Sequence, residues 1–149
     1  MISLDFDSNL RVQLFGEFVR TGRAPSVVRL AEIMSAPVDE IRASMERLAS
    51  ARVISLQPES RELLFAAPLS AVPTPFLVRA GGLPMFGSCI WDALGIIAML
   101  QQDGAVETSC PCCGEAMTLD VRAGRPASSH GVIHFAIPAK HWWDNIAFT

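Results

Sequence analysis

The sequence predicts an α+β fold, in which a three-helix, winged-helix-like N-terminal part precedes a small antiparallel-sheet domain carrying one site-bearing helix. Apolar residues recur at helical spacing up to about residue 51, strand-like runs dominate the second half, and prolines crowd the region between them. Half of the 149 residues are hydrophobic and 18% are charged. This composition favours a packed globular protein.

Three helices are predicted in the N-terminal part. The first covers residues 9–19 and ends at Thr21-Gly22. The second opens at Pro25-Ser26 and is broken by Ser35-Ala-Pro37. The third begins near residue 38 and runs to about residue 51. Their apolar faces carry Leu10, Leu14, Phe15 and Phe18, then Val27, Val28, Leu30, Ala31 and Ile33, then Ile41, Met45 and Leu48.

Two short strands are predicted next, at residues 53–56 and 62–66 around a turn-prone segment. Three helices followed by a hairpin suggest a winged helix. Pro68, Pro73 and Pro75 then predict a linker. We therefore expect a winged-helix-like domain over 1–67, a Pro-rich linker over 68–78 and an α+β domain over 79–149.

The second domain is expected to hold a helix over residues 89–100 and strands over 105–109, 117–121 and 131–137. Residues 145–149 read as the start of another strand. Alternating apolar and polar residues support these strands. An antiparallel sheet with one helix fits this order.

Charge argues against nucleic acid as a partner, because the formal net charge is −3. The formal charges on or just after the third predicted helix sum to zero, because Arg42, Arg47 and Arg52 are balanced by Asp39, Glu40 and Glu46. The N-terminus lacks the pattern of a secretory signal, and no apolar stretch approaches the roughly 18 to 20 residues of a membrane span. The sequence is thus read as that of a soluble, cytoplasmic protein with no membrane contact.

Cys89 and Asp92 form the strongest candidate site. A free thiol with a pKa of about 8.5 must lose its proton to act as a nucleophile or as a ligand for a soft metal. Cys89 enters a predicted helix after a Gly-Ser turn, where backbone N–H groups can stabilise a thiolate. Asp92 lies about one turn further along the same face. The pair combines a soft nucleophile with a proton carrier, although a buried small residue beside a first-turn carboxylate explains the same spacing.

The other three cysteines lie in Cys110-Pro-Cys-Cys-Gly114. Clustered thiols in a reducing compartment indicate metal binding, catalysis or redox chemistry. Cys-x-x-Cys-Gly is half of a zinc knuckle, so a structural zinc ion at Cys110 and Cys113 is an alternative, though a less favoured one. The two further ligands would come from this set: Cys89, His130, His134 and His141.

The segment Phe86-Gly-Ser-Cys-Ile-Trp-Asp-Ala-Leu-Gly95 resembles the active-site helix of the alkylmercury lyases, which carry a Cys-x-x-Asp followed by an apolar helix. The resemblance continues through residues 106–121, where that family has a cysteine, a turn with glycine and an alternating strand. It extends to residues 131–138 and to the N-terminal helices.

This resemblance implies protonolysis of a carbon–mercury bond. It assigns Cys89 as nucleophile and mercury ligand, Asp92 as proton shuttle and oxygen ligand, and Cys110 as a structural cysteine. Soft thiolate ligands suit this metal. No cofactor is required, since mercury belongs to the substrate. The implied partners are an organomercurial, small thiols and a thiol-bearing protein that accepts Hg(II).

One feature departs from the family. Its second catalytic cysteine comes late, near a strand resembling residues 145–149, and no cysteine follows Cys113 in this sequence. Either the chain continues past Thr149, or it is a divergent relative, or Cys112 or Cys113 folds back to bind the mercury. The alternative function is a non-enzymatic, thiol-based heavy-metal-binding protein or a winged-helix metal-responsive regulator.

Overall fold

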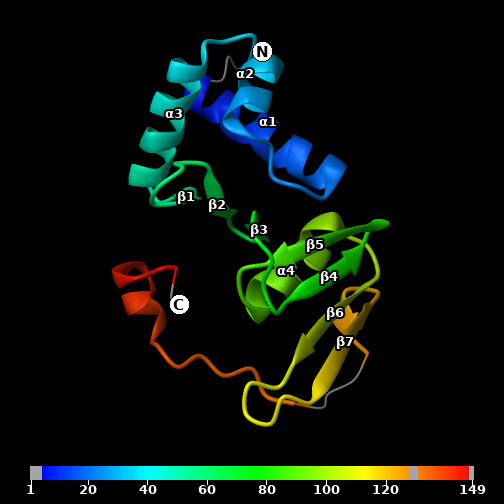
Figure 1. The fold of residues 1–149 in the computed structure, drawn as a ribbon. Helices are drawn as coiled ribbons and strands as arrows, with labels where there is room; N and C mark the ends of the chain where they lie inside the picture. Colours follow the sequence, from blue (N-terminus) through cyan, green and yellow to red (C-terminus); the bar gives the residue numbers. More distant parts are fainter. Residues whose placement is uncertain (1–4, 128–130, 148–149) are drawn as a thin grey trace.

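A computed structural model describes residues 5–127 and 131–147. Its elements follow the predicted order of a helical part and then a sheet with one helix (Figure 1). The helices are α1 (Phe6–Thr21), α2 (Val27–Met34), α3 (Val38–Ser50), α4 (Ile90–Leu100) and the short 3₁₀ helix η1 (Ala139–Asp144). The strands are β1 (Ser55–Leu56), β2 (Leu63–Ala66), β3 (Leu69–Ser70), β4 (Leu77–Ala80), β5 (Leu83–Gly87), β6 (Gly104–Ser109), β7 (Ala116–Arg122) and β8 (Arg125–Pro126).

All eight strands belong to one sheet, in the order β1-β2-β3-β5-β4-β6-β7-β8. Every neighbouring pair is antiparallel. Helix α4 packs on β3, β4, β5 and β6. The predicted α+β class is confirmed.

The N-terminal helices form where their sequence signals lie. Asp5 caps α1 by accepting a hydrogen bond from the Ser8 N–H at 2.7 Å. The helix ends at Gly22, whose φ of 70° suits a residue without a Cβ. Ser26 caps α2 in the same way as Asp5 caps α1. The three helices and the β1–β2 pair thus give the element order expected of the winged-helix-like part.

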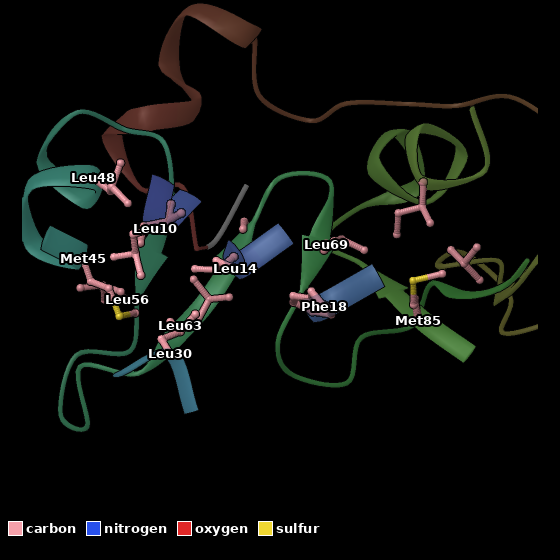
Figure 2. Packing of buried hydrophobic residues seen from close by; sticks show 14 of the residues in the cluster. Leu10, Leu14, Phe18, Leu30, Met45, Leu48, Leu56, Leu63, Leu69 and Met85 are labelled. Atoms are coloured by element: carbon pink, nitrogen blue, oxygen red, sulfur yellow. The ribbon is translucent and has the colours of Figure 1, made fainter. Parts of the chain in front are cut away.

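One hydrophobic core joins the two halves of the chain. Figure 2 shows Leu10, Leu14 and Phe18 of α1 facing strand residues, with Phe18 beside Leu69. Leu69 lies in β3, within the segment predicted as a linker, and β4 begins at Leu77. Pro68 lies between β2 and β3, and Pro73 and Pro75 lie between β3 and β4, where no ladder N–H is needed. Residues 68–78 therefore include β3 and the start of β4, and they continue the sheet between the helical part and α4.

The hairpin of β4 and β5 was not predicted. Gly81 and Gly82 form its two-residue turn with φ values of 65° and 80°, a conformation that favours glycine. Pro84 obscures the strand pattern, but it lies in the part of β5 that β3 does not pair. A missing N–H there costs the sheet nothing.

The strand predicted at residues 131–137 is wrong, since the structure describes this segment without a strand. The far edge of β7 is paired by β8 instead. Residues 145–147 form no strand either, while 148–149 lie outside the described residues. Phe135 and Trp142 pack with ring centroids 5.3 Å apart, and Trp143 stacks with Arg52 at the end of α3. The C-terminal segment thus returns toward the N-terminal part (Figure 1).

Close packing at Gly87 fixes where α4 begins. A Cβ added at Gly87 would lie 2.5 Å from the backbone nitrogen of Ala93 in the first turn of α4. We expect Gly87→Ala to lower the free energy of unfolding by about 1–3 kcal/mol, because the helix must move off the strand. Chemical denaturation measures this.

Gly16 provides the matched control for that substitution. It lies inside α1 and has nothing within 4 Å of an added Cβ. Gly16→Ala should raise the free energy of unfolding by up to about 1 kcal/mol, since alanine favours the helix. Equal effects of the two substitutions would contradict the close contact at Gly87.

Candidate active site at the start of helix α4

Cys89 occupies the N-cap position of α4. Its backbone is extended, with φ −145° and ψ −179°, and its Sγ accepts a hydrogen bond from the Asp92 N–H at 3.4 Å. The sulfur fills the role that a serine or aspartate oxygen usually plays at a helix N-terminus. It is therefore held against the free N–H groups of the first turn, as predicted from the sequence.

Burial opposes ionisation of Cys89. The side chain is half-buried, and burial raises the pKa of its thiol above the ordinary value. Hydrogen bonds from the backbone N–H groups of Asp92 and Trp91 lower this pKa, but they are the weaker effect overall. The expectation that the helix N-terminus alone favours the thiolate is thus incomplete. At neutral pH the thiol keeps its proton until a base or a metal removes it.

Asp92 carries a titratable carboxyl on the same helical turn. Burial raises the pKa of its carboxyl, while a hydrogen bond with the Cys89 side chain opposes the rise. The two groups lie on one helical turn, and the charge of Asp92 further raises the pKa of Cys89. Between the two pKa values the pair holds a single proton, which can pass from sulfur to oxygen.

Two buried hydroxyls near this end of the sheet were missed by sequence reasoning. The Oγ of Ser88 and the Oγ1 of Thr108 are buried and have no hydrogen-bond partner among the described residues. Ser88 directly precedes Cys89, whereas Thr108 follows Glu107, which pairs with Leu77 of β4. Ser88 could have been found from the Gly-Ser turn. Thr108 could not, because it reaches this end only through strand register.

Two surface hollows lie away from Cys89 and Asp92. One, of about 550 Å³, is lined by residues of α1, by Ala67 and Pro68, and by Met99 near the C-terminal end of α4. The other, of about 400 Å³, surrounds the β4–β5 turn and Gly104. Neither lining includes the Cys89–Asp92 pair, so the chemistry of this pair and not the size of a hollow defines the candidate site.

The remaining cysteines lie in the loop between β6 and β7, which extends as a hairpin beyond the neighbouring strands (Figure 1). The Gly114 N–H donates to the Cys110 carbonyl at 2.8 Å, and the Cys110 N–H donates to that of Glu115 at 2.8 Å. Backbone N–H groups of Cys113 and Cys112 lower the pKa of the Cys110 thiol. Cys110 is half-buried, and Cys112 and Cys113 are exposed.

The structure does not gather these cysteines around Cys89. Across residues 5–127 and 131–147, no group of three or more His, Cys, Asp or Glu side chains could hold a metal ion. Cys112 and Cys113 are thus not folded back onto Cys89 and Asp92. Of the histidines considered as zinc ligands, His141 pairs with Asp144 at 2.9 Å, and His130 lies outside the described residues.

Three arginines of the N-terminal part make contacts within the protein. Arg47 binds Asp7 at 2.6 Å, Arg61 binds Glu46, and Arg52 stacks on Trp143. These contacts use the cationic groups that a phosphate-binding surface would need. As to membranes, the helices described here are too short or too polar to span a bilayer.

Comparisons with known proteins point to one family. The sequence model described as "MerB: Alkylmercury lyase" matches residues 69–149, more than half of the chain. Among solved structures, the fold is similar to "Crystal structure of the mercury-bound form of MerB2", with a TM-score of 0.63 and 23% sequence identity. The similarity covers 85% of this chain, which spans 60% of that protein. No curated protein matches.

Proposed function

Because the chain belongs to the alkylmercury lyase family, we propose that it cleaves the carbon–mercury bond of organomercurials by protonolysis at Cys89 and Asp92. The observation that carries the proposal is the position of both side chains at the start of α4, where the pKa values of the Cys89 thiol and the Asp92 carboxyl are both raised. The substrate is then a compound R–Hg⁺ with a soft metal and a basic carbon.

The first step forms a sulfur–mercury bond. The Cys89 thiol attacks the mercury of R–Hg⁺, and its proton passes to the Asp92 carboxylate. Binding to a soft cation makes the thiol far more acidic. Cys89 therefore loses its proton even though burial raises the pKa of the free thiol. The products of this step are R–Hg–S of Cys89 and a neutral Asp92 carboxyl, whose neutrality suits its partly buried position.

The second step breaks the carbon–mercury bond. The Asp92 proton is transferred to the carbon, the electron pair of the bond forms C–H, and R–H leaves. Hg(II) remains on the Cys89 sulfur, with the Asp92 carboxylate regenerated beside it. Two small thiols then bind the metal as thiolates and remove it; one of their two protons returns to the Cys89 sulfur and the other is released to solvent. Such thiols are abundant in a reducing cytoplasm, where we place the protein; a thiol-bearing acceptor protein would take the metal in the same way.

The dependence of the cleavage rate on pH follows from the single shared proton. Below the pKa of Asp92 the pair holds two protons and the thiol lacks a base, so the rate falls as pH decreases. Above the pKa of Cys89 the pair holds none, so no proton reaches the carbon. Both pKa values are raised. We therefore expect a bell-shaped profile whose acid limb lies above the range of exposed carboxyls and whose alkaline limb lies above that of ordinary thiols.

Single-turnover cleavage rates of an organomercuric chloride, measured at a series of pH values, give this profile. No small thiol is added, because its own titration would overlap with that of the protein. Asp92→Asn is the control, because the acid limb should vanish in that variant. An acid limb in the range of an exposed aspartate would contradict the proton-sharing pair.

Turnover is tested with phenylmercury and an excess of small thiol, by following benzene. Sustained release above the rate in buffer supports the enzyme. Tight Hg(II) binding without benzene would instead support the second candidate, a thiol-based mercury carrier. That candidate is favoured by one observation, which is that no third Cys, His or acidic ligand among the described residues joins Cys89 and Asp92.

A further inference from the structure

The loop at residues 110–115 holds three of the four cysteines in one closed turn. Its two ends are closed by the backbone hydrogen bonds between Cys110 and Glu115 and between Gly114 and Cys110. Interactions with the backbone N–H groups of Cys113 and Cys112 and with the Cys113 side chain lower the pKa of the Cys110 thiol. Gly114 takes a φ of 75°, which lets the chain turn back. The turn closed by the hydrogen bond from the Gly114 N–H to the Cys110 carbonyl therefore holds Cys110 and Cys113 within one short loop.

We propose that Cys110 and Cys113 form a second soft-metal site, separate from Cys89, which binds Hg(II) through two thiolates. Soft thiolate ligands select soft metals, and Hg(II) is satisfied by two of them. A closed zinc site needs four ligands. Among the described residues no third Cys, His or acidic side chain completes such a set. Two thiols held in one short loop therefore fit Hg(II) better than zinc.

The placement of this loop relative to Cys89 follows from strand register. Leu77 of β4 pairs with Phe86 on one side and with Glu107 on the other. Cys89 and Cys110 each lie three residues beyond these partners, at the same end of the sheet. Strands β5 and β6 are two strand spacings apart, about 10 Å. Hg(II) released from Cys89 thus meets the second site on the same edge of the molecule.

Binding proceeds by thiol exchange. A mercury ion carried by two small thiolates gives two sulfur–mercury bonds to Cys110 and Cys113. The two protons of these thiols pass to the departing small thiolates, and no oxidant or reductant is needed. The site does not depend on carbon–mercury cleavage, so its test is separate from that of the proposed function.

The experiment titrates the reduced protein with Hg(II) in the presence of a competing small thiol, in a Cys89→Ser background that removes the first site. We expect about one equivalent to bind, seen as thiolate-to-mercury absorption, and to protect Cys110 and Cys113 from alkylation. Adding Cys113→Ser should weaken binding about a hundredfold, because chelation is lost. Cys113 is exposed, so the fold should remain, which circular dichroism checks.

Cys112→Ser in the same background is the matched control, since Cys112 is exposed like Cys113 but its side chain is not among the groups that lower the pKa of Cys110. It should bind as the background does. Loss of binding in Cys89→Ser alone, or an equal loss in the Cys112 and Cys113 variants, would overturn the site. Binding of Zn²⁺ at least as tight as that of Hg(II) under the same competition would overturn the choice of metal.

Discussion

Cys89→Ser is expected to lower the rate of carbon–mercury cleavage by at least about a thousandfold, because the nucleophile and the mercury ligand are lost together. A serine hydroxyl is a hard oxygen that ionises far above neutral pH, so it bonds poorly to mercury. Serine is also a preferred N-cap residue, and its oxygen can accept the Asp92 N–H bond that Sγ accepts now. Helix α4 should therefore remain intact.

Two measurements separate chemistry from folding in this variant. Benzene release from phenylmercury reports the reaction, and chemical denaturation reports the free energy of unfolding, which should stay within about 1 kcal/mol of the parent. Cys112→Ser is the control for loss of a thiol elsewhere and should retain the parent rate. A Cys89→Ser variant that cleaves at the parent rate would remove Cys89 from the mechanism.

Asp92→Asn is expected to lower turnover by about a hundredfold to ten-thousandfold, the usual contribution of a positioned acid–base group. The amide matches the carboxyl in size and keeps the backbone N–H that binds Cys89, but it cannot carry the proton from sulfur to carbon. Removal of a carboxyl whose burial raises its pKa should not destabilise the fold. The Cys89 thiol should still capture the organomercurial.

The variant should thus accumulate R–Hg–S of Cys89, which mass spectrometry of the intact protein detects. Asp39→Asn supplies the control, because Asp39 is an exposed first-turn aspartate on α3. That variant should cleave at the parent rate. Parent-like turnover in Asp92→Asn would show that the proton comes from another group.

Local sequence signals predicted the helices because each one depends on neighbours in the chain. Leu10, Leu14 and Phe18 face the core as their spacing indicated, and the Gly22 stop is real. The alternation of apolar and polar residues over 131–137 predicted a strand that does not form. A strand needs a partner, and β8 already pairs with the outer edge of β7. In that segment Val132 is 92% exposed. Whether an alternating segment becomes a strand depends on the rest of the sheet.

In the candidate site, too, local sequence signals predicted some features, and other features depend on contacts between distant segments. The Cys-x-x-Asp spacing placed Cys89 and Asp92 on one helical turn, which the structure shows. The sign of the thiol pKa shift could not be read from spacing, because it is set by packing around the start of α4. Thr108 comes to this end of the sheet through the pairing of β6 with β4, which no local pattern reveals.

Protonolysis at Cys89 is tested most directly by cleaving methylmercury or phenylmercury in D₂O and analysing the hydrocarbon by mass spectrometry. The exchangeable proton on Cys89 and Asp92 is then deuterium, so each released molecule should carry one deuterium, at the carbon that held mercury. Cys89→Ser should release none above buffer. Hydrocarbon without deuterium, or equal deuterated release from Cys89→Ser, would contradict proton delivery through the Cys89–Asp92 pair.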